Sequence, residues 1–367
     1  MRTTLFRTCR LTALVLGIAL AGAGGAAAQG LADTDTLTAT PPHFFGSMDL
    51  YYRLSSTEAR SISSPSLRHN AFVPFWFRLG VDQQYGRSGV RAELTFGERA
   101  ASFYAEDGDG ADVWDYVRGL EVYTHAGTAK LQLGTYPIYY GFEHDDPYFN
   151  PLYTNSHVYS YTAAQLTGFQ ATAPVGTDGD KVMVGVYNSS QVRIDDDGHL
   201  LFGGEYVLAH GDGEHFSYFN VLGGRDSDEQ LFVMLNASGE FGLSPKLTLA
   251  YDLLYHRYEY PEFDEPTYFG GAAGYVIVEP SPRWRHALRL EHFADPRAFG
   301  QRRAGTLQAA SACTTYRYGP FEARAELRYD RGERAVLPTD DLDALGRPVF
   351  RNDGLALTLA VLYGFGE

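Results

Sequence analysis

The sequence predicts an all-β protein: a transmembrane antiparallel β-barrel of about 16 strands with short periplasmic turns and long external loops. Three observations lead to this fold class. Apolar and polar residues alternate along many segments, and short and long connections alternate along the chain. No apolar run after Gln29 approaches the roughly 20 residues that a spanning helix needs. A barrel crosses a bilayer without such runs, because its strands pair with one another and close.

The chain begins with the pattern of a secretory signal. Three arginines precede an apolar run at 11–21, and Ala26-Ala27-Ala28 is a small-residue cleavage site. A membrane anchor is the alternative, but the apolar run is short and ends in glycines. We therefore expect a signal peptide at 1–28, an N-terminal periplasmic segment at 29–43 and the barrel at 44–367.

The charge and the cysteines narrow the function. Cleavage would remove three arginines and change the net charge from −15 to −18. A strongly acidic secreted protein is a poor candidate for binding nucleic acid. Cys313 would be the one cysteine of the mature chain, so no intramolecular disulfide is expected.

The alternation predicts each strand in turn. Val90 and Leu94 fall on one face of a segment, and Arg91 and Glu93 fall on the other, which is the signature of a strand with one apolar side. In a barrel the apolar face meets lipid and the polar face lines the lumen. The expected strands are 44–54, 71–84, 89–97, 114–125, 129–136, 165–174, 181–188, 199–209, 215–222, 229–239, 246–256, 268–278, 284–294, 305–316, 321–329 and 354–365.

The connections favour a barrel over a soluble sandwich. A sandwich has no reason to segregate short turns from long loops, whereas an outer-membrane barrel does. No amphipathic helix is expected between the strands. Aromatic residues at strand edges predict girdles at the membrane interfaces, and ordinary strand propensity is the alternative. These aromatic residues are Tyr51, Tyr52, Phe75, Trp76, Phe77, Trp114, Tyr255, Tyr258, Tyr268, Phe269 and Trp284.

The connection 137–164 is the segment that points most strongly to function. It is far longer than a hairpin needs, and loops of that length are usually functional or disordered. Its many aromatics argue for order, so we expect it to fold over or into the barrel mouth. There Glu143, His144, Asp145 and Asp146 would lie near the constriction and attract cations. A solvated surface loop and a calcium site are the alternatives.

A second set of charged residues lies on faces predicted to line the lumen. Opposed charges there would create a transverse field across a water-filled pore. Simple solvation and mutual pairing are the alternative. A charge on the lipid face at mid-bilayer would cost roughly 2–4 kcal/mol, so these side chains belong inside. The residues are Arg91, Glu93, Arg289, Glu291, Glu322, Arg324, Glu326 and Arg328.

Acidic runs also occur in three predicted external loops, at 195–197, 259–265 and 340–341. The simplest interpretation is that they are solvated. A sharper hypothesis is that they bridge to lipopolysaccharide through divalent cations.

Several motifs resemble a known family. The opening FFGSMDLYYRLSS, the hairpin FRLGVDQQYGRSGVRAELTFGERA and above all LQLGTYPIYYGFEHDD are similar to outer-membrane porins of Gram-negative bacteria, the OmpL-like β-barrel porin 2 group. The likeness covers roughly residues 44–190 and implies a passive pore without enzyme activity. This chain departs from the family by ending on Glu367, with Phe365 two places inside, and by carrying Ala163-Ala164-Gln165 where the family has Pro-Phe.

The sequence thus predicts a porin that passes small hydrophilic solutes, with loop 137–164 constricting the pore and a mild cation preference. A barrel of 12 to 14 strands, or one sealed by its loops that serves as an adhesin or structural protein, is the alternative. No Gly-x-Ser-x-Gly or His-Glu-x-x-His motif occurs, so neither an enzyme nor a cofactor is expected. The expected partners are outer-membrane lipid, lipopolysaccharide, the assembly machinery and small solutes, with monomer and homotrimer both open.

Overall fold

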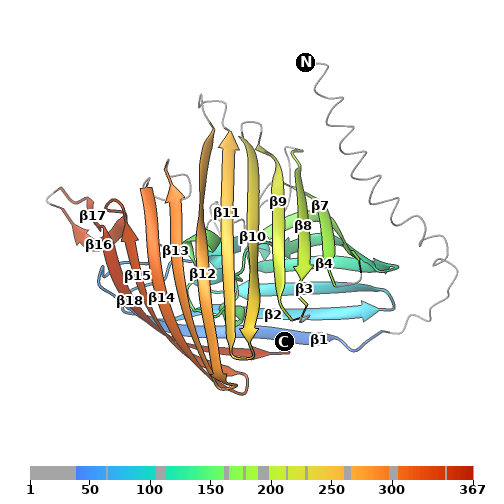
Figure 1. Cartoon of the computed structure of the whole chain (residues 1–367), viewed down its shortest axis with the longest axis horizontal. Helices are drawn as coiled ribbons and strands as arrows, with labels where there is room; N and C mark the ends of the chain where they lie inside the picture. The colour runs from blue at the N-terminus through green and yellow to red at the C-terminus, as the bar shows by residue number, and fades with distance from the viewer. Residues whose placement is uncertain are drawn as a thin grey trace, which may run out of the picture.

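The computed structural model describes residues 39–62, 65–104, 113–160, 165–176, 179–188, 198–211, 214–227, 230–259, 266–296, 305–343 and 345–366. Antiparallel strands close into a barrel of 16 strands (Figure 1). In chain order these strands are β1 (His43–Ser55), β2 (Phe72–Tyr85), β3 (Ser88–Phe96), β4 (Val117–Ala126), β5 (Ala129–Pro137), β6 (Gln165–Pro174), β7 (Lys181–Tyr187), β8 (Leu201–Ala209), β9 (Phe216–Ser227), β10 (Gln230–Ser244), β11 (Leu247–Glu259), β12 (Thr267–Ser281), β13 (Trp284–Asp295), β14 (Gly305–Tyr318), β15 (Phe321–Gly332) and β18 (Asp353–Phe365).

The first and last strands close the barrel. Gly46 of β1 lies opposite Phe365 of β18, and Ser55 lies opposite Ala356. The C-terminus therefore lies at the end that carries the tight turns (Figure 1), which is the periplasmic end of the predicted topology. Strand β9 runs on to Ser227, beyond its expected end at residue 222, and β10 begins at Gln230.

The two faces of each strand differ as the alternation predicts. On β13, Leu288 and Leu290 are 55% and 69% exposed, whereas Arg289 and Glu291 are 0% and 6% exposed. The same alternation along β15 and β18 leaves leucines exposed and Glu326 and Thr358 buried. The barrel thus presents an apolar wall outward and a polar wall inward.

Secondary structure also forms where loops were expected. Helix α2 (Glu98–Tyr104) and the 3-10 turn η1 (Val113–Tyr116) lie between β3 and β4, so Trp114 does not begin a strand. A separate hairpin of β16 (Leu337–Leu342) and β17 (Pro348–Arg351) lies between β15 and β18. The helix, the 3-10 turn and the two hairpin strands are all too short for their sequences to show a periodic pattern. Among the described residues, no helix is long and apolar enough to span a membrane.

The aromatic girdle was predicted correctly only in part. Phe77, Tyr255, Tyr268 and Trp284 are exposed on the outer wall, as expected. In contrast, four of the proposed girdle residues are buried inside the barrel: Tyr51, Phe75, Trp76 and Phe269. A β-bulge between β1 and β2 sets Asp49 opposite Trp76 and Leu50 opposite Pro74. The bulge breaks the alternation, so the two neighbouring aromatics of β2 both turn inward.

Candidate functional site

The segment between β5 and β6, described for residues 138–160 and called the inner loop below, lies inside the barrel. Its residues 150–159 are all buried. The 3-10 turn η2 (Pro147–Phe149) begins where the Asp146 carboxylate accepts the Tyr148 N–H at 2.9 Å. The short helix α3 (His157–Ser160) begins where Ser156 Oγ accepts the Tyr159 N–H at 3.0 Å. These side-chain caps give the loop an ordered path.

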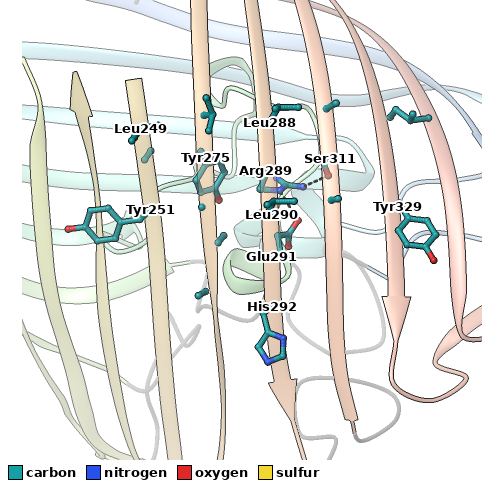
Figure 2. Close-up of a pocket in the computed structure, with 18 of the residues that line it drawn as sticks. Leu249, Tyr251, Tyr275, Leu288, Arg289, Leu290, Glu291, His292, Ser311 and Tyr329 are labelled. Atoms are coloured by element: carbon teal, nitrogen blue, oxygen red, sulfur yellow. Dashed lines mark hydrogen bonds and ion pairs between the residues drawn. The ribbon is translucent and has the colours of Figure 1, made fainter. Parts of the chain in front are cut away.

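Arg289 of β13 binds the inner loop most extensively. Its guanidinium donates to Glu143 Oε1 at 2.5 Å and to the Thr154 carbonyl at 2.6 Å. Glu291, two residues along the same strand, accepts from Arg289 Nε at 2.7 Å and from the His157 N–H at 2.6 Å. Figure 2 shows Arg289 and Glu291 on β13 beside the outward-facing leucines.

Strand β15 continues this wall with alternating bases and acids. Arg324 donates to the Pro147 carbonyl at 2.7 Å, and Arg328 donates to the Asn155 carbonyl at 2.9 Å. Between them, Glu326 accepts the Tyr153 N–H at 2.6 Å. The arginines therefore bind loop carbonyls and the glutamates bind loop amides.

The opposite wall holds the acidic part of the loop. Arg118 of β4 forms a two-pronged ion pair with Asp145, at 2.7 and 2.8 Å. Arg78 of β2 pairs with Asp146 at 2.9 Å. Both arginines also pair with Glu93 of β3, which takes a third arginine, Arg91, at 2.7 Å.

A third set of contacts comes from β10 and β11. Gly141, whose φ of +100° favours glycine, donates its N–H to Asn236 Oδ1 at 3.2 Å. Asp252 accepts the Phe142 N–H at 3.0 Å and the Asn236 amide at 2.7 Å. The inner loop is thus bonded to the wall on three sides.

These contacts change the role predicted for the acidic cluster. Glu143, Asp145 and Asp146 are buried, and each pairs with a lumenal arginine. Buried charges are tolerated when they are paired and hydrogen-bonded, so these carboxylates anchor the loop and their charge is compensated locally. His144 is different: its side chain is exposed and its ring lies 5.6 Å from the Phe149 ring.

Two tyrosines of the inner loop reinforce its burial. Burial raises the pKa of Tyr153 and of Tyr159 well above the usual value, and the nearby Asp49 and Asp145 carboxylates act in the same direction. Both phenols therefore stay neutral at any physiological pH. The Tyr153 hydroxyl donates to Asp49 at 3.1 Å.

An apolar cluster occupies part of the external half of the lumen. Phe232, Phe269 and Phe293 project inward from β10, β12 and β13 and are at most 4% exposed. The same cluster contains Val158 of the inner loop and Leu337 of β16. Loops and wall therefore pack together at this end.

The periplasmic half of the lumen is more accessible along β4–β10. Lys181 is exposed, and the Lys130 side chain is 34% exposed. An amide ladder crosses this wall: Gln132 donates to Glu121 at 2.7 Å, and Gln170 donates to Gln132 at 3.1 Å. Several lumen-facing residues of this wall are partly exposed, namely Tyr123, Thr172, Glu205, Tyr218 and Glu240.

The structure brings together most of the residues predicted for the constriction. Arg289, Glu291, Arg324 and Arg328 bind the inner loop. Glu93 is linked to the loop through Arg118 and Arg78, and Arg91 pairs with Glu93. Their role in selectivity stays a prediction. Among the described residues, no group of three or more His, Cys, Asp or Glu side chains is placed to hold a metal ion.

The sequence interpretation missed several wall residues that bind the inner loop. Arg78 and Asp252 lie on strands with clear alternation, so their inward direction could have been found. Arg118 is the extra residue of a bulge between β3 and β4, which hides its direction. The others include Asn236, Asp49, Arg285, Asp330 and Ser47.

A closed barrel of 16 strands with a loop folded into its lumen defines the class of outer-membrane porins. The sequence model of the family described as "Putative beta-barrel porin-2, OmpL-like" matches residues 42–362. The chain belongs to this family, whose members are channels of the Gram-negative outer membrane. No curated protein matches the sequence.

Solved structures share the fold at low sequence identity. An anion-selective porin from Comamonas acidovorans is 9% identical with a TM-score of 0.63, covering 89% of this chain and 100% of that one. Outer-membrane expressed OmpT of Vibrio cholerae is 12% identical with a TM-score of 0.60, covering 91% and 99%. The channel DcaP of Acinetobacter baumannii is 14% identical with a TM-score of 0.57, covering 92% and 99%.

Proposed function

We propose that the protein is a passive diffusion channel for small hydrophilic solutes and ions, and that the inner loop narrows its pore. Barrels of this strand number leave an aqueous channel unless something fills it. One observation carries the proposal: the loop is ion-paired to opposite walls, through Arg289 of β13 and Arg118 of β4. A loop held in this way reduces the open cross-section.

The accessible wall of β4–β10 is the proposed route past the inner loop. Tyrosines, amides and a few charges line it, which suits small polar solutes. We also propose a mild cation preference that arises from this wall, because the acids of the inner loop are already paired. In the periplasmic half of this wall, the described inward-facing acids (Glu121, Glu205 and Glu240) outnumber the bases (Lys130 and Lys181), and such an excess raises the local cation concentration.

A barrel sealed by its loops is the second candidate. The apolar cluster of Phe232, Phe269, Phe293, Val158 and Leu337 supports it, because this cluster closes part of the external half. Such a barrel would act as an adhesin, a surface-binding protein or a structural protein of the outer membrane.

The placement in the outer membrane implies a route of export, processing and assembly. Residues 1–28 would direct export and be removed, 29–43 would stay in the periplasm, and 44–367 would be inserted by the assembly machinery. A trimer form has been described for OmpT of Vibrio cholerae, and we propose a homotrimer here as well. The native mass of the detergent-solubilised protein tests the oligomer.

The deciding experiment is single-channel recording of the refolded mature protein in a planar bilayer, with the reversal potential measured in a salt gradient. Discrete current steps with a cation-positive reversal potential are expected. Steps with no bias would keep the pore and remove the selectivity proposal. Silence from a heat-modifiable, correctly folded barrel would overturn the pore and favour the sealed barrel.

A further inference from the structure

The outer wall of the barrel carries an apolar groove of about 970 Å³. Its floor includes Ala310 and Ala312 of β14, and leucines such as Leu290 form raised edges. A Cβ added at Gly274 would meet nothing within 4 Å, so the groove is open there. Figure 2 shows residues that line it, from Tyr251 on one side to Tyr329 on the other.

A polar pocket of about 570 Å³ adjoins the groove at its external end. Gln308, Arg331 and Asp353 line it, and Tyr329 lines both cavities. The strand register fixes their order. Gln308, Arg331 and Asp353 form one cross-strand row, and Ala310, Tyr329 and Leu355 form the row two residues nearer the periplasm. The combined cavity is therefore apolar in the membrane and polar where the strands leave it.

The charges of the polar pocket are available to a ligand. Arg331 and Asp353 are cross-strand neighbours and both are exposed, yet no ion pair joins them in the described part of the chain. Asp353 accepts a hydrogen bond from the Tyr329 hydroxyl at 3.3 Å. Glu333 accepts one from Thr306 at 3.3 Å. A base and two carboxylates thus face a shared space.

We infer that the groove and the polar pocket together bind lipopolysaccharide. Its acyl chains would lie in the groove, and Arg331 would contact a phosphate directly. Glu333 and Asp353 would reach phosphate through a divalent cation, because Mg²⁺ is typically held by one or two carboxylates together with phosphate oxygens. This inference goes beyond the proposed function: it rests on the placement in the outer membrane and does not require conduction.

Two features favour lipopolysaccharide over an ordinary phospholipid. The polar pocket lies at the external end of the strands, in the leaflet that lipopolysaccharide occupies. The groove is lined by residues of six adjacent strands, β11–β15 and β18. At about 4.8 Å per strand its width is roughly 24 Å, which suits an amphiphile with several acyl chains.

The test compares variants of the full mature protein, refolded in detergent free of lipopolysaccharide and titrated with purified lipopolysaccharide in Mg²⁺. Ala310→Phe with Ala312→Phe fills the groove, and about tenfold weaker binding is expected. The matched control is Ala323→Phe with Ala325→Phe, which are outward-facing on β15 but outside the groove, and it should bind as the native protein does. Heat-modifiable electrophoretic mobility verifies folding.

The polar pocket is tested separately by Arg331→Gln and Asp353→Asn, which change exposed side chains and leave the barrel wall intact. Each should weaken binding, and chelation of Mg²⁺ should abolish the effect of Asp353→Asn.

Equal losses of affinity for the two phenylalanine pairs would overturn the site in favour of general lipid contact. If phosphatidylethanolamine in the same detergent displaced lipopolysaccharide as well as unlabelled lipopolysaccharide does, the assignment of the site to lipopolysaccharide would be overturned. Loss of an oligomer with unchanged affinity would show that the groove is a contact between copies.

Discussion

Arg289 is the residue on which the position of the inner loop depends most. It is fully buried and compensates both Glu143 and Glu291. In Arg289→Met, Glu143 loses its guanidinium partner while Glu291 keeps Arg328, and an uncompensated buried charge costs roughly 3–5 kcal/mol. We expect the loop to leave β13 and the single-channel conductance to rise, as measured in planar bilayers.

Arg91→Met is the control for this change. Arg91 is partly exposed and pairs with Glu93 and Asp82, without contacting the inner loop in the described part of the chain. Its loss should leave the conductance nearly unchanged. Equal conductance increases in both variants would show that the loop does not depend on Arg289.

A pH-dependent change is expected at the tip of the β16–β17 hairpin. The Arg347 N–H, the Arg347 guanidinium and the Leu345 N–H lower the pKa of Asp343. Because the pKa of Asp343 is lowered in the folded protein, its ionised carboxylate stabilises the hairpin tip fully above the ordinary carboxyl pKa of about 3.9. This stabilisation of the tip is lost as the pH falls through the pKa that Asp343 has in the folded protein. Amide exchange of Leu345 and Arg347 should accelerate in that acid range, whereas Asp343→Asn should exchange fast at neutral pH as well.

At the residue scale, the sequence predicted well which side chains point into the lumen, but it predicted poorly which residues they bind. The alternation placed Arg289, Glu291, Arg324 and Arg328 in the lumen, because side-chain direction is a local property of a strand. It could not predict that Arg289 binds Glu143, a residue 146 positions away. That contact depends on the path of the inner loop, and the loop sequence has no periodic pattern from which its path could be predicted.

At the scale of the element, the Asp145–Arg118 pair tests whether the acids of the inner loop act as anchors or as a cation ring. In Asp145→Asn, Arg118 loses a two-pronged partner, so the lumen gains net positive charge and the reversal potential should shift toward anions. Charged hydrogen bonds contribute about 1.5–3 kcal/mol, so the loop should also loosen and the conductance should rise.

The double variant Asp145→Asn with Arg118→Gln separates the two roles. Because it removes a neutral pair, the reversal potential should return to the native value while the conductance stays high. A cation ring would give a different result: the reversal potential of the double variant would match that of Asp145→Asn alone.

The strands were predictable because each has a long enough pattern of period two. Helix α2 was not, since 7 residues give too little periodicity, and the hairpin of β16 and β17 was not, since its strands have 6 and 4 residues. The inner loop was expected over or in the barrel mouth, and the structure resolves this alternative. Side chains of β13 and β15 draw it inside by binding its backbone.

At the scale of the whole molecule, the lumen divides into two halves of different character. The external half contains an apolar cluster in which loops pack against the wall, whereas the periplasmic half is polar and partly open along β4–β10. A solute entering from outside would therefore meet a barrier first and a polar wall second. We infer that movement of the loops limits the current, and that the polar wall sets the selectivity.

The last prediction concerns that polar wall. Glu205 and Glu240 face the accessible lumen and are partly exposed. Glu205→Gln with Glu240→Gln should bring the reversal potential toward zero, because the wall loses its acid excess, while the conductance changes little. Glu58→Gln, in an exposed external loop, is the matched control and should have no effect on the reversal potential.

The salt dependence of this effect tests its electrostatic origin. Since the Debye length falls from about 10 Å at 0.1 M salt to about 3 Å at 1 M, the difference in reversal potential between the variant and the native channel should shrink as salt rises. A difference that persists at 1 M salt would mean that selectivity depends on close contact in a narrow constriction and not on the field of this wall.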